Sequence, residues 1–390
     1  MKRRLILLLS FLICTYTAKA QVITYYKDIQ PIFQDKCFSC HTKGKHYFLF
    51  DTYSMVRSKS SMLDFVIQND IMPPWPADDD YQNYKHSRSL TVDEKAIIKR
   101  WQETGFLEGE KITYNVKKIK KIKGKHLSIP FHSFSIPANE RDTFITFKLP
   151  FSFKHSNKIN RIEFSSTWLS YIHHINLFIG KSNTKMLDAD FVYGYAPGMD
   201  QNGFTDGQGF YLPASGEITG DIHIPPISKP INLDLKIFLY TTDIPIEHEL
   251  FFLGQKGFKI KNMANLIIPH DSVIDVEGEM PVEKDVYITH IMPHMHLLGK
   301  RIKVWCVDGM GNQTPLVKID NWVFQWQNYY EFKEPIFIPG GSTIMVQATY
   351  DNTAENKTNP NIPPIDVTEG WLSQQEMLSV FMLAYHPNVK

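Results

Sequence analysis

The chain has 390 residues, and its apolar side chains (43%) and aromatic rings (13%) are sufficient for packed cores, which excludes a disordered chain. This length predicts two or three domains. The formal net charge is +1, so overall charge gives no reason to expect a nucleic-acid partner. A disulfide framework is also excluded, because only Cys37, Cys40 and Cys306 lie beyond the N-terminal segment and two of them share one motif.

The first 20 residues have the pattern of an export signal. Basic residues at 2–4 precede an apolar run at 5–13, and the sequence A-K-A at 18–20 supplies a cleavage site before Gln21. This pattern predicts a cleaved signal peptide over residues 1–20 and a mature protein in the periplasm or outside the cell. The apolar run is too short to cross a bilayer comfortably, so we expect no stable membrane insertion. A retained anchor is the alternative.

Residues 21–108 have the texture of a small helical module. Its clearest helix signals lie in TVDEKAIIKRWQETG, where Thr91 and Glu94 form a capping box and Gly105 marks the end. Residues 109–125 follow, rich in lysine with alternating isoleucines, and we expect a solvated linker or an edge strand there. A basic patch that binds a membrane surface is the alternative.

Within this module, residues 37–41 read CFSCH. This spacing is the attachment signature of c-type haem, in which the thiols of Cys37 and Cys40 add to the vinyl groups and His41 becomes an axial ligand of the iron. A chance C-x-x-C pair with another metal or redox role is the alternative, although a zinc site would need two further ligands. Haem attachment outside the cytoplasm agrees with the export signal.

The sixth iron ligand should be a soft donor on a separate segment. The sequence NDIMPPWPAD contains Met72, followed by two prolines that favour an extended, rigid backbone. A thioether opposite a histidine raises the potential and favours electron transfer. Met55 and Met62 are alternatives in sequence that looks helical. With these features, residues 25–106 resemble a class I cytochrome c domain, which implies a covalently bound haem c with His41 and Met72 as axial ligands.

From residue 126 onward the chain changes to short runs of alternating hydrophobicity. Examples are RDTFITFKLPF, INLDLKIFLYTT and STIMVQATY, separated by proline, glycine and asparagine. This pattern predicts antiparallel all-β sandwiches or jelly rolls. The segment is too long for one small sandwich, so we expect two domains, over 126–275 and 276–390.

Histidine patterns in the β-rich part suggest metal sites. His173 and His174 are adjacent in HHINLF, and His294 and His296 are two apart in HMHLLGK. Residues two apart in a strand share a face and can bind one ion, whereas an adjacent pair requires a bulge or the use of different ring nitrogens. Each histidine by itself is more often a packed or surface residue.

Two single residues could complete such sites. His223 ends the run GEITGDIH, and Met377 lies in the apolar run QEMLSVFMLAY. Imidazoles together with a thioether favour copper over zinc, because sulfur stabilises Cu(I).

From about residue 130 to the end, the chain resembles the copper type II ascorbate-dependent monooxygenases, which include peptidylglycine α-hydroxylating monooxygenase and dopamine β-monooxygenase. The segments GYAPGMD (194–200), NWVFQWQNYYEFKEP (321–335) and ATYDNTAENKTNPN (348–361) are similar to bacterial members. The resemblance implies two linked jelly-roll sandwiches with one copper ion each. The implied ligands are His173, His174 and His223 for the first copper, and His294, His296 and Met377 for the second.

The resemblance also implies a chemistry. The second copper, with His294, His296 and Met377 as the catalytic set, would use O2 to hydroxylate an aliphatic C–H bond of a small organic substrate. The first copper would store an electron and deliver it across a water-filled cleft. An external reductant or a periplasmic donor would supply electrons, and the fused haem would pass them to the first copper. A haem module that only docks a partner is the alternative.

Some positions depart from the family. Peptide-amidating members hold a substrate carboxylate with arginine, asparagine and tyrosine where this chain has Met292, Ser379 and Phe381. A glycine-extended peptide is therefore not the expected substrate. His290 shares the alternating face of His294, and we expect it beside the metal rather than as a ligand. The overall hypothesis is an exported copper-dependent monooxygenase, an oxidoreductase; a non-catalytic exported redox or copper-binding protein is the alternative.

Overall fold

A computed structural model describes residues 22–38, 40–41, 48–112, 125–129, 131, 133–180, 190–196, 203–205, 207–254 and 258–387. The expected signal peptide and most of the expected lysine-rich linker lie outside these residues. The chain forms two compact units: residues up to 69 with 90–116, and residues 70–89 with the chain from 117 onward. None of the helices in the described ranges is both long and apolar enough to span a membrane.

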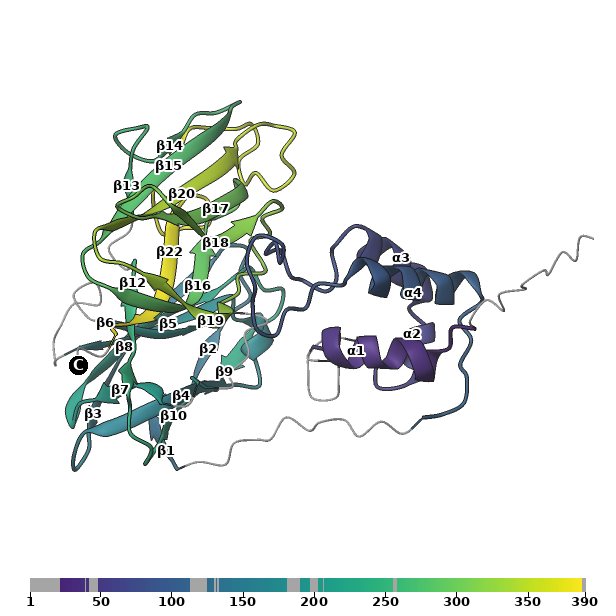
Figure 1. The fold of residues 1–390 in the computed structure, drawn as a ribbon, viewed down its shortest axis with the longest axis horizontal. Helices are drawn as coiled ribbons and strands as arrows, with labels where there is room; N and C mark the ends of the chain where they lie inside the picture. Colours follow the sequence, from purple (N-terminus) through teal and green to yellow (C-terminus); the bar gives the residue numbers. More distant parts are fainter. Residues whose placement is uncertain are drawn as a thin grey trace, which may run out of the picture. The chain divides into compact units, whose positions relative to one another are not determined.

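The first unit is helical (Figure 1). Its elements are a π-helical turn η1 (Tyr25–Ile29), α1 (Gln30–Lys36), α2 (Tyr53–Arg57), α3 (Ser60–Gln68) and α4 (Val92–Glu103). The capping box predicted at the start of α4 is confirmed, because Glu94 N donates to Thr91 Oγ1 and Thr91 N donates to Glu94 Oε2. Gly105 has φ +84° just after this helix, so it takes the left-handed conformation expected of a stop residue.

The second unit begins with a two-sheet β sandwich. One sheet has the strand order β1 (His126–Ile129), β10 (Lys236–Thr241), β4 (Asn157–Ser165), β7 (Gln208–Leu212), β11 (His248–Glu249). The other has the order β3 (Thr143–Ser152), β8 (Ser215–Ile224), β5 (His174–Gly180), β6 (Asp190–Tyr195). A short pair, β2 (Phe134–Ile136) with β9 (Ile231–Leu233), and the 3-10 turn η2 (Leu169–Tyr171) complete it. Its core contains the fully buried side chains of Ile159, Ile175 and Ile222.

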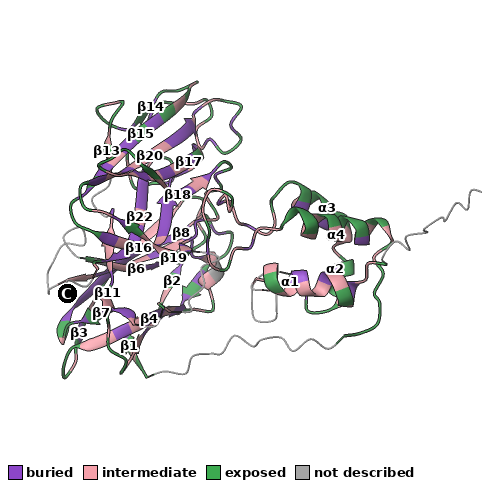
Figure 2. Cartoon of the chain, viewed as in Figure 1, coloured by how far each residue is buried: buried purple, intermediate pink, exposed green. Residues whose placement is uncertain are grey.

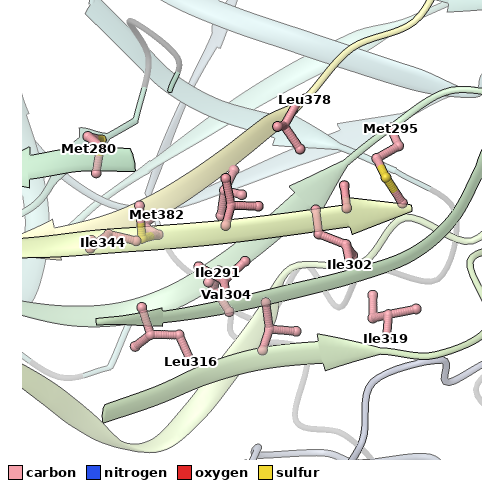
Figure 3. Packing of buried hydrophobic residues seen from close by; sticks show 14 of the residues in the cluster. Met280, Ile291, Met295, Ile302, Val304, Leu316, Ile319, Ile344, Leu378 and Met382 are labelled. Carbon is pink, nitrogen blue, oxygen red and sulfur yellow. The ribbon is translucent and has the colours of Figure 1, made fainter. Parts of the chain in front are cut away.

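A second sandwich follows. One sheet has the order β12 (Phe251–Leu253), β22 (Ser379–Tyr385), β16 (Val286–His294), β19 (Tyr330–Ile338). The facing sheet has the order β13 (Lys259–Ile260), β15 (Val273–Val282), β20 (Ser342–Asp351), β17 (Gly299–Val307), β18 (Gln313–Ile319), and β14 (Ile267–Ile268) pairs with β21 (Val367–Thr368). Figure 3 shows Ile291 and Met382 of the first sheet packing against Val304 and Ile344 of the second.

The burial of β20 shows why alternating sequence forms these sheets. Ile344, Val346, Ala348 and Tyr350 are buried at every second position, as expected for a strand with one face on a core (Figure 2). Cys306 on β17 is a buried free cysteine, in agreement with the excluded disulfide framework. The expectation of a mainly β chain with sandwich domains is thus confirmed, while jelly-roll connectivity stays a prediction.

The change from the first sandwich to the second comes earlier than the predicted position near residue 275. β11 pairs with β7 of the first sandwich, whereas β12 already pairs with β22 of the second. The strands β12 and β13 are too short to show the alternation on which a sequence boundary depends. The sequence alone therefore did not show which sandwich these two strands join.

Residues 70–89, called the strap here, group with the β unit rather than with the helical module to which the sequence assigned them. The strap forms bridges to both sheets of the second sandwich, Ala77 with Ile319 of β18 and Tyr84 with Phe332 of β19. Both partners are edge strands, which carry unpaired backbone groups. The proline-rich strap is extended and supplies the missing partners, and this explains its place in the fold.

Candidate metal sites

Three histidines of the first sandwich form a compact cluster. The ligand atoms of His173, His174 and His223 all lie within 4.8 Å of one another. Adjacent antiparallel strands produce this arrangement, because His174 at the start of β5 is directly opposite His223 on β8. His173 precedes the strand at a bend after η2, and its N–H donates to His223 O (2.8 Å). The alternation of a regular strand therefore does not separate the adjacent pair.

Each ring of this cluster has an outer partner on Nε2. His173 Nε2 donates to the Phe324 carbonyl (3.0 Å), His223 Nε2 lies 2.9 Å from Asp142 Oδ1, and His174 Nε2 lies 3.3 Å from Asp221 Oδ2. The three Nδ1 atoms are then available for a metal, and those of His173 and His174 are 3.3 Å apart. Metal-binding histidines typically have the other nitrogen held in this way, which fixes the tautomer. The donor set fits a metal ion.

The electrostatics favour neutral rings at His173 and His223. Burial, reinforced by His174 and His223, lowers the pKa of His173 to about 3, and burial likewise lowers the pKa of His223. Burial by itself would raise the pKa of Asp142, but the hydrogen bond to His223 brings it below its ordinary value. Neutral imidazoles beside a carboxylate are the protonation states that a divalent metal requires.

The second set lies on the second sandwich. His294 ends β16 and His296 follows it, and both are buried, while Met295 between them points into the hydrophobic core (Figure 3). The two histidine rings lie close together, with centroids 5.0 Å apart. His294 Nδ1 donates to Gln327 Oε1 (2.5 Å) and His296 Nδ1 donates to Gln375 O (2.9 Å). Both Nε2 atoms are therefore available, and this pair also fits a metal ion.

The backbone of Met377 lies near that of His296. β16 ends at His294, which pairs with Ser379 at the start of β22, and the N–H groups of His296 and Met377 both donate to Glu376 Oε2. Tyr350 donates from its hydroxyl to Met377 O (2.7 Å), which fixes the main chain at this point. Coordination by the thioether stays a prediction.

Glu376 forms hydrogen bonds with the loop that carries the second histidine set. Its carboxylate is fully buried and accepts hydrogen bonds from Leu298 N (2.6 Å), His296 N (2.9 Å) and Met377 N (3.3 Å). A single side chain thus joins the backbone of a predicted histidine ligand to the backbone of the predicted thioether ligand. Burial raises the pKa of Glu376 to about 8, although the three backbone N–H donors each act to lower it.

The histidine pKa values predict an acid-sensitive metal-free protein. Burial lowers the pKa of His173 to about 3 and of His296 to about 4, both below the ordinary value of 6.5. The unfolded chain therefore takes up more protons between about pH 6.5 and 4, and the free energy of unfolding should fall by about 2 kcal/mol per such histidine between pH 7 and 5.

Urea denaturation of the metal-free protein at both pH values measures this loss, and His296→Gln should reduce it. The exposed His270, whose pKa Asp366 raises, gives a matched control in His270→Ala, which should not reduce the loss. Equal unfolding free energies at pH 7 and pH 5 would contradict the prediction.

His290 shares a face of β16 with His294 but has other partners. Its Nδ1 lies 2.9 Å from Thr289 Oγ1 and its Nε2 lies 3.9 Å from Glu331 Oε2. Together with Trp75 and Lys85 of the strap it lines a small cavity. His290 and His294 are four positions apart on β16, which is about 13 Å along the strand. His290 is therefore a residue of the cavity wall in this structure.

The predicted haem residues lie at the end of α1. His41 N donates to Cys37 O (3.0 Å), and Cys40 N donates to the same carbonyl (3.1 Å), so the motif forms one tight turn. His41 Nδ1 donates to Phe48 O (2.8 Å), and its ring stacks on Phe50. A buried histidine held through Nδ1 fits an axial ligand.

Met72 lies in the strap, and therefore in a different unit from His41. Its role as the second axial ligand stays a prediction.

Sequence reasoning did not find the partners that orient the histidines. Asp221 could have been found, because it lies two residues before His223 and strand alternation places both on one face. Asp142, Gln327 and the Phe324 carbonyl had no such signal. They reach the sites from other strands or from an irregular loop.

The C-terminal part of the chain is similar to a known family domain. Residues 262–390 match the C-terminal domain of the copper type II ascorbate-dependent monooxygenases. The matched residues include His294, His296 and Met377, so the match supports copper and monooxygenase chemistry in general. No match to a curated protein was found.

Similarity to solved structures is weak. PNGF-II shares 11% identity over 67% of this chain and 65% of its own (TM-score 0.27), and a Paenibacillus xanthan lyase shares 9% over 68% of this chain and 25% of its own (TM-score 0.16). The CBM22 tandem domain of Xyn10C from Paenibacillus barcinonensis shares 8% over 68% of this chain and 99% of its own (TM-score 0.17). Scores this low carry no conclusion about fold or function.

Proposed function

We propose that the protein is an exported copper-dependent monooxygenase that hydroxylates an aliphatic C–H bond of a small organic molecule with O2. The supporting observation is the pair of oriented histidine sets: three imidazoles with Nδ1 available, and two with Nε2 available near the backbone of Met377. The second set lies inside the residues that match the family domain. Export is supported by the pattern of residues 1–20.

The residues of this chain would hold two copper ions, each with its own set of ligands. His173, His174 and His223 would hold one copper, and His294, His296 and Met377 the other. Bound copper would supply one-electron redox chemistry and the activation of O2. Asp142, Asp221 and Gln327 orient the ligand rings, and Glu376 holds the backbone on which two of the ligands lie.

Metal analysis and turnover test the proposal together. Purified protein incubated with Cu(II) should bind two copper ions per chain and give the electron paramagnetic resonance spectrum of type 2 copper. With ascorbate and a panel of small organic compounds, oxygen uptake should match the hydroxylated product formed. Met377→Ala should abolish that uptake while the three-histidine site keeps its copper. Two bound copper ions with no oxygen uptake above the free-copper background would support a non-catalytic copper protein instead.

We further propose that the helical unit carries a covalent haem c that supplies electrons to the first copper. The supporting observations are the Cys37-x-x-Cys40-His41 turn at the end of α1 and the outer hydrogen bond of His41. Met72 is the proposed second axial ligand. An internal electron donor would replace part of the external reductant that a monooxygenase needs.

The haem proposal has a separate test. Protein produced with the haem-attachment machinery should show a c-type absorbance spectrum, which Cys37→Ser should remove or alter. Reduced haem in the copper-loaded protein should be reoxidised by Cu(II) without oxygen. The matched His223→Ala protein, which lacks a complete first copper site, should stay reduced. Haem that stays reduced in the unaltered protein would refute electron supply to the copper ions.

A further inference from the structure

The loop between β18 and β19 lies between the two histidine sets. Phe324 stacks on the ring of His173 (centroids 4.4 Å apart, 26° between planes) and lies edge-on to His296 (5.9 Å, 80°). Gln327 is buried, with 5% of its surface exposed, and its side chain reaches both sets. The family resemblance implies a water-filled cleft between the sets, whereas this structure has these two residues between them.

The hydrogen bonds of Gln327 have consistent donors and acceptors. Its Oε1 accepts from His294 Nδ1 (2.5 Å), and its Nε2 donates to the Phe324 carbonyl (2.9 Å). The same carbonyl accepts from His173 Nε2 (3.0 Å). The 3.5 Å separation of Gln327 Nε2 and His173 Nε2 is then the approach of two donors that share one acceptor, not a further hydrogen bond.

These assignments determine which nitrogen of each ring faces its metal site. A proton on His294 Nδ1 leaves the lone pair on Nε2, and a proton on His173 Nε2 leaves the lone pair on Nδ1. Three hydrogen bonds thus join a ligand of the first set to a ligand of the second through one carbonyl and one amide. A carboxylate could accept from His294 but could not donate to Phe324, and an aliphatic side chain could do neither.

We propose that Gln327 is a positioning residue that orients His294 for its metal ion and links the two metal sites. This proposal rests on the metal sites of the proposed function but not on hydroxylation. Its readouts are therefore metal affinity and histidine resonances, which do not depend on turnover.

The first measurement is Cu(I) affinity at the two-histidine set. A His223→Ala background removes the other set, and a chromophoric Cu(I) chelator competes for the metal. Adding Gln327→Leu should weaken binding by about 10–100-fold, the usual effect of losing an outer partner of a ligand. Gln327→Glu should stay within about threefold of the unaltered residue, because it still accepts from His294. Val323→Ala, an exposed residue of the same loop, is the matched control and should have no effect.

Thermal denaturation of each variant separates loss of fold from loss of orientation. A Gln327→Leu protein that binds Cu(I) weakly but unfolds at the same temperature as its background supports the proposal. The proposal is wrong if Gln327→Leu binds Cu(I) as tightly as its background, if Gln327→Glu is as weak as Gln327→Leu, or if the background protein binds no Cu(I).

The second measurement tests the link between the sites, with all five histidines present. One equivalent of Zn(II) should occupy the three-histidine set, because zinc has little affinity for thioether. In protein labelled with ¹⁵N-histidine, this loading should shift the Nδ1–H signal of His294. Gln327→Glu should keep that signal but lose the zinc-induced shift, because the connection to Phe324 is broken. An equal shift in both proteins would refute the link.

Discussion

Replacing His223 with alanine is expected to reduce bound copper from two ions per chain to one and to abolish substrate hydroxylation. His223 is 2% exposed and supplies one of three imidazoles whose ligand atoms lie within 4.8 Å. Losing an outer partner of a metal ligand typically costs 10–100-fold in affinity, so losing the ligand itself should cost more than about 100-fold. Copper content after dialysis against a weak chelator measures the change.

The residual copper identifies which site was lost. The electron paramagnetic resonance spectrum of His223→Ala should keep the signal from the His294 and His296 site and lose the other. His270→Ala is the matched control, because this histidine is exposed and pairs with Asp366 rather than with a metal set. Two firmly bound copper ions in His223→Ala would mean that the cluster is not a copper site.

Replacing Glu376 with alanine is expected to lower the free energy of unfolding by about 3–5 kcal/mol. The change removes the acceptor of three backbone N–H groups, at His296, Leu298 and Met377, in a place that solvent does not reach. A buried donor left without a partner costs about 1–3 kcal/mol, and part of the total is recovered as the loop relaxes. Urea denaturation of the metal-free protein gives the free energy directly.

The variant Glu376→Gln keeps the shape of the side chain and changes its hydrogen-bond acceptors. The amide keeps the shape of the side chain but turns its NH2 group toward at least one of the three backbone N–H donors, so the expected loss is about 1–3 kcal/mol. Glu355→Gln, at an exposed position on the same sandwich, should change stability by less than about 0.5 kcal/mol. A Glu376→Ala protein as stable as Glu355→Gln would show that the loop does not depend on this carboxyl.

Local sequence patterns predicted the features that depend on neighbours in the chain. The capping box at Thr91 and Glu94 was predictable because both partners lie in one helical turn. The closeness of the His294 and His296 rings followed from strand alternation in the same way. The alternating runs from residue 126 onward predicted β sandwiches, because a period of two leaves one face apolar.

Features that depend on contacts between distant segments required the tertiary structure. His173 and His174 converge because a bend precedes β5 and because β8 places His223 opposite, and adjacency in the sequence contained neither fact. The strap was assigned to the helical module because it follows helices in the chain. In three dimensions, its extended backbone pairs with the edge strands β18 and β19.

The sequence by itself determined which candidate donors are present: five imidazoles and a thioether in an order that favours copper, and a C-x-x-C-H motif typical of haem attachment. The tertiary structure alone decided the orientation of the imidazoles. Asp142, Asp221 and Gln327 each contact a histidine from a different strand or loop, and those contacts select the nitrogen that would face a metal ion. The physical reason is that a ligand's identity is local, whereas its tautomer depends on whatever the fold packs against its far side.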